Sequence, residues 1–225
     1  SIDGGQTFSG QNVFTGLLPG DYTVQIVDAT GCGTTRQATI VPPAVFVIDL
    51  ATEVQISFGE SYQINTTVSI PLSDIASIQW TPATGLSCDT CLSPLAMPLT
   101  STRYNLTVIS DVGCEERAPL LLRVDREIDI YIPNIFSPDG DGDNDVFMIF
   151  ANTDQVRIIK EFQVYSRWGE QVLYLKDFLP NDPQFGWDGN HRGDPLNPAV
   201  FVWYVVVELI DGREVLLEGD VTLTR

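Results

Sequence analysis

The chain has 225 residues, a formal net charge of -18 and a hydrophobic content of 44%. Its 12 basic residues form no cluster, which excludes nucleic acid as an expected partner because phosphate binding needs clustered Lys and Arg. No apolar run reaches the roughly 18 residues of a membrane-spanning helix, so direct membrane insertion is not expected. The 14 prolines and 18 glycines divide the chain into short segments, which favours an all-β fold of tandem immunoglobulin-like (Ig-like) β-sandwich modules.

Residues 1–42 contain about four short candidate strands, fewer than a sandwich requires. The segment also lacks the basic and apolar regions of a signal peptide. We therefore expect it to be a partial module whose missing strands lie upstream in a longer protein.

One pattern occurs twice with the same spacing. The matching residues are Tyr22, Val24, Ile26, Gly31 and Cys32 in the first copy, and Tyr104, Leu106, Val108, Gly113 and Cys114 in the second. Alternating apolar and polar positions place one face of a strand in a core and the other in water, and the glycine favours a turn. Each copy is predicted to be a strand followed by a hairpin turn.

The dipeptide Pro42-Pro43 marks a linker, because it cannot continue a central strand. Residues 43–126, which follow it, are predicted to form a complete sandwich that contains the second copy of the repeat.

The four cysteines are too few and too poorly spaced to predict a four-ligand zinc site. Cys88 and Cys91 form a Cys-x-x-Cys motif, for which we favour a structural disulfide that closes a small loop. A redox pair would require a helix N-terminus in a thioredoxin-like βαβ unit, which the sequence does not predict. Reduced thiols are the other alternative.

Residues 127–225 are predicted to form a further small sandwich. Its expected strands cover residues 128–132, 146–150, 162–165, 171–174, 200–210 and 214–223. His191 is the only histidine and is expected in an exposed turn, which argues against a serine triad or a histidine metal cluster. We therefore expect a protein without enzymatic activity.

Aspartates alternate with glycine and asparagine in one loop of this last segment. The four are Asp139, Asp141, Asp143 and Asp145. Hard oxygen ligands on a flexible backbone suit calcium, although residue 150 is not the glutamate that an EF-hand needs. The alternative, which we favour, is that these side chains accept hydrogen bonds from backbone amides in a tight turn.

Two tryptophan motifs, Arg167-Trp168-Gly169 and Gly186-Trp187-Asp188-Gly189, allow two interpretations. Tryptophan faces can stack on sugar rings, so the motifs could form a carbohydrate platform. We favour core packing beneath a hairpin, with Arg167 bound to a carboxylate such as that of Asp188.

Sequence motifs in the first two segments resemble known bacterial modules. Residues 3–8, 12–14 and 20–32 are similar to the SprB-like repeat of gliding adhesins, and Trp80-Thr81-Pro82, residues 85–88 and residues 102–104 are similar to PKD-like, Ig-like modules of Bacteroidota surface proteins. In such modules the tryptophan packs beneath the sheet, so the resemblance implies a buried Trp80.

The last segment resembles the type B C-terminal sorting domain of type IX secretion cargo, also called the gliding motility-associated C-terminal domain. The matching residues are Asn134, Phe136, residues 137–142, residues 144–147, Tyr165, residues 167–170, Val172, residues 186–189, Gly193, Asn197, Pro198 and residues 219–223. The resemblance implies a secreted protein of the bacterial cell surface, associated with the outer membrane. It also implies recognition by a PorP/SprF-like outer-membrane protein and the type IX translocon.

We assign partner recognition to nine residues of this domain, namely Asn134, Phe136, Arg167, Trp168, Gly169, Trp187, Asp188, Val221 and Leu223. The last strand is one candidate element, because a partner's sheet can extend along a strand edge; docking of a rigid sandwich face is the second. The rival hypothesis is an adhesin whose modules before Asp125 bind glycan or protein ligands directly.

Overall fold

The computed structural model describes residues 1–42 and 45–225. Regular structure in these ranges consists of β-strands and two single-turn 3-10 helices, Leu72–Asp74 and Pro183–Phe185. The predicted all-β fold class is confirmed. None of the helices in the described part of the chain has the length and apolar character needed to cross a membrane.

The chain forms two compact units. One comprises Ser1–Ile48, Val68–Ser77 and Val108–Glu116, and the other comprises Asp49–Thr67, Ile78–Thr107 and Arg117–Arg225. The boundaries expected near residues 42 and 126 stay predictions. Pro43 of the expected linker lies outside the described residues.

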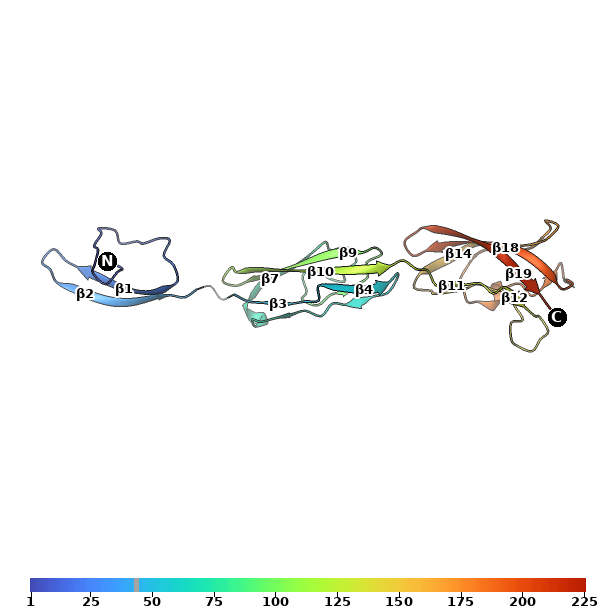
Figure 1. The fold of residues 1–225 in the computed structure, drawn as a ribbon, viewed down its shortest axis with the longest axis horizontal. Coiled ribbons are helices and arrows are strands. Elements are labelled where there is room, and N and C mark those ends of the chain that lie inside the picture. The colour runs from blue at the N-terminus through green and yellow to red at the C-terminus, as the bar shows by residue number, and fades with distance from the viewer. Residues whose placement is uncertain (43–44) are drawn as a thin grey trace. The chain divides into compact units, whose positions relative to one another are not determined.

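The two copies of the repeat form equivalent hairpins. Strands β1 (Gly20–Val27) and β2 (Gly33–Ile40) are antiparallel, and β9 (Thr102–Ser110) is followed directly by β10 (Glu115–Asp125) (Figure 1). In each turn the amide before the loop donates to the cysteine carbonyl, Asp28 to Cys32 and Ser110 to Cys114, both at 2.8 Å. The preceding glycines have φ of 88° and 87°, a left-handed conformation that favours glycine. The predicted strand and turn are confirmed in both copies.

The middle segment is built around a four-stranded sheet in the order β4-β10-β9-β7. Here β4 (Glu53–Ser57) runs parallel to β10, and β7 covers Ile75–Thr81. Two short sheets accompany it, β3 (Ile48–Asp49) with β6 (Thr67–Val68), and β5 (Tyr62–Gln63) with β8 (Leu95–Ala96). Tyr104 and Leu106 of β9 are completely buried, which confirms the predicted inward face of the second repeat.

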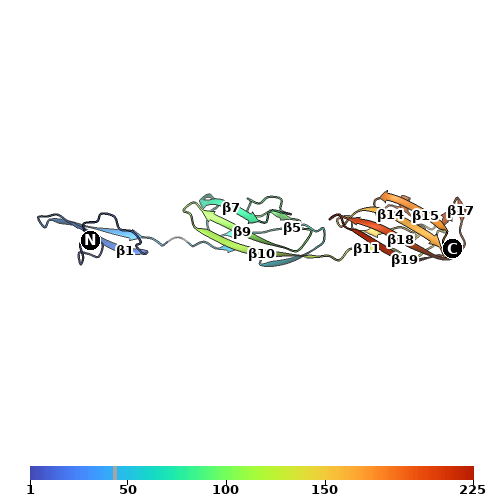
Figure 2. The ribbon, with the colours of Figure 1, turned by 90° about the horizontal axis from the view of Figure 1, so that it is seen from above.

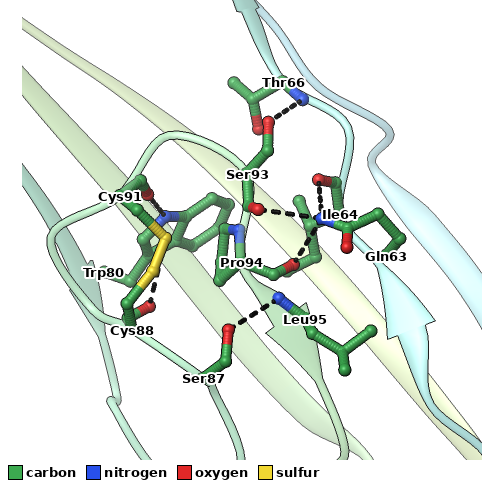
Figure 3. Close-up of a disulfide and its surroundings, with 10 residues drawn as sticks. All are labelled: Gln63, Ile64, Thr66, Trp80, Ser87, Cys88, Cys91, Ser93, Pro94 and Leu95. Carbon is green, nitrogen blue, oxygen red and sulfur yellow. Dashed lines mark hydrogen bonds between the residues drawn. A yellow bond between two sulfur atoms is a disulfide. The ribbon is translucent and has the colours of Figure 1, made fainter.

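The predicted disulfide joins Cys88 to Cys91, whose Cα atoms lie 5.9 Å apart (Figure 3). The loop that it closes covers Trp80, whose indole N–H donates to the carbonyl of Cys91 at 2.9 Å. Trp80 is buried, as the resemblance implied. The disulfide therefore closes the loop whose carbonyl accepts the indole N–H of Trp80, the one polar group of this buried side chain. This is a structural role.

The C-terminal segment contains a five-stranded sheet in the order β12-β19-β18-β14-β15 (Figures 1 and 2). Its strands are β12 (Ile135–Phe136), β14 (Val156–Ser166), β15 (Gln171–Phe178), β18 (Ala199–Leu209) and β19 (Glu214–Leu223). All neighbours are antiparallel except β12, which runs parallel to β19. Two small pairs complete the segment, β11 (Ile130–Tyr131) with β13 (Phe150–Ala151), and β16 (Asn190–His191) with β17 (Asp194–Pro195).

One face of this sheet carries the C-terminal core. Its buried side chains include Phe162, Val164, Phe201, Trp203, Val205, Val221 and Leu223, and Phe136, Phe147 and Trp187 belong to the same hydrophobic cluster. The alternation of β18 and β19 places their even-numbered residues on the opposite face. This opposite face includes half-exposed Val200 and Val202.

The expected strands agree least with the structure at β14 and at residues 146–150, while β11 is shorter and β15 longer than expected. β14 begins at Val156 instead of residue 162, because two register shifts between Val156 and Glu161 interrupt the alternation on which the prediction depended. Residues 146–150 alternate as expected, with Phe147 and Ile149 buried, but Phe147 makes only an isolated bridge to Trp187. Burial pattern alone therefore did not identify a paired strand.

Candidate functional site

The hairpin between β14 and β15 exposes a tryptophan. The amide of Gly169 donates to the carbonyl of Ser166 at 2.9 Å, which closes a turn with Arg167 and Trp168 at its two central positions. Trp168 is 84% exposed, and the guanidinium carbon of Arg167 lies 5.1 Å from the centre of its ring. The expectation that Trp168 fills the core is wrong, because side chains at the centre of a hairpin turn project beyond the sheet.

The tryptophan of the second motif, Gly186-Trp187-Asp188-Gly189, packs in the core, as the sequence predicted for both motifs. Trp187 is 1% exposed, and its indole N–H donates to the carbonyl of Asn190 at 2.9 Å. Asp188 accepts from the backbone and side-chain amides of Asn190 at 3.0 and 2.8 Å. The expected pairing of Asp188 with Arg167 is therefore wrong, since Asp188 stabilises its own turn.

The aspartate loop brings three of the four predicted ligands together. One carboxylate oxygen each of Asp139, Asp141 and Asp145 lies within 4.8 Å of the others, and Asp143 is not part of this group. The two oxygens of Asp145 accept from the amides of Gly140 and Gly142 at 2.8 and 3.0 Å. Hydrogen bonds from backbone amides thus occupy both oxygens of the central carboxylate, which supports the turn-capping interpretation. Calcium stays a prediction.

Replacing Asp145 with asparagine is expected to lower the free energy of unfolding by about 1–2 kcal/mol, because an amide group would face one of the two backbone N–H donors. Asp143→Asn is the matched control and is expected to change stability by less than about 0.5 kcal/mol. Urea unfolding in calcium and in chelator separates the two roles. Equal losses in both conditions support capping, whereas a wild-type gain in calcium that the variant lacks identifies a cation site.

His191 is less exposed than expected. Its side chain is 17% exposed, with Nε2 at 3.4 Å from a carboxylate oxygen of Glu170 and Nδ1 at 3.3 Å from the carbonyl of Val172. The short β16–β17 hairpin places the ring beside the start of β15, so the prediction of an exposed turn residue is wrong. This contact between a small hairpin and a strand distant in sequence is not visible as a local pattern.

The outward face of the C-terminal sheet carries a tyrosine pair that the sequence analysis did not identify. The rings of Tyr165 and Tyr204 are stacked, with centres 6.1 Å apart and planes at 16°. Desolvation, the hydrogen bond to Tyr165 and the charge of Glu161 raise the pKa of Tyr204 above its ordinary value. The alternation of apolar and polar residues in β18 indicates that Tyr204 faces outward. It does not indicate the cross-strand register, which places Tyr165 of β14 beside Tyr204.

The family of this region follows from a comparison with protein-family models. The model described as the CHU_C type IX secretion signal domain matches residues 130–218. This region is a type IX secretion signal domain. A sorting signal of this family supports a role of the chain as type IX secretion cargo, which is secreted to the cell surface.

Solved structures similar to the chain are distant in sequence. One is latent PorU from Porphyromonas gingivalis (12% identity, 92% of this chain and 24% of that chain covered, TM-score 0.29). Another is a tetra-tandem repeat of a large adhesion protein (13% identity, 93% of this chain and 58% of that chain covered, TM-score 0.36). SGBP-B of the Bacteroides ovatus mixed-linkage glucan utilization locus, solved in complex with a mixed-linkage heptasaccharide, also matches (16% identity, 78% of this chain, 44% of that chain, TM-score 0.27). The chain thus spans less than two thirds of each of these proteins. A comparison with curated proteins finds no match.

The nine residues assigned to recognition fall into two groups within the C-terminal segment, which contains the signal-domain match and is called the signal domain below. Phe136, Trp187, Val221 and Leu223 are core residues, whereas Asn134, Arg167, Trp168, Gly169 and Asp188 are exposed. In the folded domain only the second group is accessible to a partner. β19 is paired with β18 along its whole length, so docking of a folded surface is favoured over transfer of the last strand.

Proposed function

We propose that the signal domain is a folded recognition element, which a PorP/SprF-like outer-membrane protein binds through the turn Ser166–Gly169. Binding at this turn retains the cargo on the cell surface, and the chain itself needs no catalytic activity for this role. The observation that carries the proposal is the 84% exposure of Trp168 on a domain of a secretion-signal family.

The turn has the properties of a binding hot spot. Tryptophan and arginine are the residues most enriched among side chains that dominate interface energies. The guanidinium of Arg167 already lies over the indole ring of Trp168, so part of the ordering required for binding is present before the partner arrives. The backbone amide of Trp168 also donates a hydrogen bond to the hydroxyl oxygen of Ser166 at 3.3 Å.

The test grafts residues 127–225 onto a foreign secreted reporter in a bacterium that has a type IX system. Replacing Trp168 with alanine is expected to weaken partner binding by about 2 kcal/mol, as for an interface hot spot, and to shift the reporter from the cell surface to the medium or the periplasm. Surface reporter is measured by protease accessibility and by co-purification with outer membranes.

Leu179→Ala is the matched control, because Leu179 is also largely exposed but follows the opposite end of β15. It is expected to leave surface retention unchanged. If the Trp168→Ala reporter is retained on the surface as well as the wild-type reporter, the turn is not the site that the partner binds.

The adhesin alternative concerns the modules before Asp125 and stays a prediction. It requires these modules to bind a glycan or protein ligand. A graft of residues 127–225 that is exported and retained without them assigns sorting to the signal domain, whichever ligand the modules bind.

A further inference from the structure

An open cleft of about 510 Å³ lies on the outward face of the C-terminal sheet, and Tyr165 of its lining immediately precedes the Ser166–Gly169 turn. Three strands contribute its lining, namely Tyr165 from β14, Val202, Trp203 and Tyr204 from β18, and Glu218, Gly219 and Asp220 from β19. The register places Tyr204 opposite Glu218 and Val202 opposite Asp220. Two carboxylates therefore stand beside one aromatic and one aliphatic side chain across adjacent strands.

The sheet face around the cleft exposes apolar side chains. Val200 and Val202 are each 51% exposed and Leu216 is 61% exposed. Their positions in the register place all three on the face opposite the core. Exposed apolar residues along one sheet face provide contact area for a partner.

The charges of the cleft are incompletely paired. No Lys or Arg in the described residues has an ion-pair contact with Glu218 or Asp220, and the adjacent Glu161 is paired with Lys176 at 3.1 Å. An ionised carboxylate only accepts hydrogen bonds, so these two groups suit a ligand that donates. The hydroxyl of Tyr165 already donates to Gln163 and accepts from Gln171, so the stacked rings of Tyr165 and Tyr204 offer the cleft apolar surface only where they do not cover each other.

These features together match one side chain. A guanidinium group donates from a planar fork, pairs with carboxylates and stacks on aromatic faces, whereas a sugar also needs donors that Glu218 and Asp220 do not supply. We propose that this cleft binds an arginine side chain that the outer-membrane partner presents between apolar residues. The proposal rests on the proposed function, because it identifies a second contact in the same recognition event.

The direct test is independent of secretion. The full chain is titrated with Nα-acetyl-arginine methylamide, and with the neutral citrulline analogue of the same shape, while NMR shifts of Val202, Tyr204 and Gly219 are recorded. The arginine probe is expected to bind about three- to tenfold more tightly than the citrulline probe, as expected for a partly exposed cation contact. Equal binding of both probes, or shifts located elsewhere, would overturn the proposal.

Charge-neutral variants of the same shape identify the residues. Glu218→Gln with Asp220→Asn is expected to abolish the preference for arginine. The control pair Glu214→Gln with Asp194→Asn, exposed residues outside the cleft lining, removes the same charge and is expected to preserve it. Thermal unfolding shows whether either pair of substitutions destabilises the domain. If the cleft pair does, Glu218→Gln alone replaces it in the titration. A preference for arginine that survives both cleft variants contradicts the assignment, as does binding of an oligosaccharide in place of arginine.

The grafted reporter then separates the two proposals. Loss of surface retention in the cleft variants, with the control pair unaffected, supports the cleft as a partner contact. Wild-type retention in the cleft variants overturns this inference while the proposed function stands. If the wild-type graft itself is not exported, the proposed function fails, and the NMR titration alone decides whether the cleft binds arginine.

Discussion

Replacing Trp187 with alanine is expected to destabilise the signal domain by about 3–5 kcal/mol, the range observed for large aromatic side chains removed from a core. Its ring centre lies 4.7 Å from that of Phe201 and 5.2 Å from that of Phe136. Its backbone also exchanges two 2.9 Å hydrogen bonds with Phe147. The alanine would keep these backbone bonds, but the cavity would remove the ring contacts that Phe136 and Phe201 make with the indole.

Urea unfolding of the full chain, followed by the fluorescence of the remaining tryptophans, measures the effect. Trp168→Ala is the matched control: it removes the same side chain from an exposed turn and is expected to change stability by less than about 0.5 kcal/mol. Similar losses for both variants would mean that Trp187 is not the core residue described here.

Deleting residues 219–225 is expected to abolish cooperative unfolding of the signal domain. The deletion removes the partners of Ala199–Trp203 on β18 and of Ile135 and Phe136 on β12. It also removes two completely buried side chains, Val221 and Leu223, whose burial contributes about 1.5–3 kcal/mol each. Loss of near-ultraviolet circular dichroism and rapid proteolysis of this region are the expected observations.

Removing Arg225 alone is the control, and it should leave the unfolding midpoint unchanged because this residue belongs to no strand. A domain that still unfolds cooperatively without residues 219–225 would contradict the role assigned to β19. The deletion also shows why truncation is a poor test of recognition. Export lost with the fold says nothing about which surface a partner contacts, whereas Trp168→Ala changes the surface and retains the core.

Local patterns predicted the local structure well. The two hairpins of the repeat were predictable because a strand alternation and a glycine that favours left-handed φ, Gly31 or Gly113, occur within a few consecutive residues. The disulfide was predictable for the same reason, since Cys88 and Cys91 are close in sequence. β14 was predicted too short because its irregular register near Ile158 is a property of its pairing with β18.

The site was predictable only in part. Trp168 and Trp187 are both next to glycine, and the sequence does not show directly that one occupies a hairpin turn while the other bridges to Phe147. The position of Arg167-Trp168-Gly169 between two alternating strands was the available signal for exposure. The arginine cleft depends on which residue of β18 faces Glu218 and Asp220, and this register follows from the assembled sheet.

The parallel pairing of β12 with β19 has a consequence for how the protein is synthesised. Phe136 accepts hydrogen bonds from Thr224, 88 residues later in the chain. A nascent chain that is released by the ribosome before this point has β12 without its partner and the aromatic core open on one side. A transport machinery that recognises the folded domain would therefore reject prematurely terminated cargo, and the signal would report that translation had passed through the whole domain.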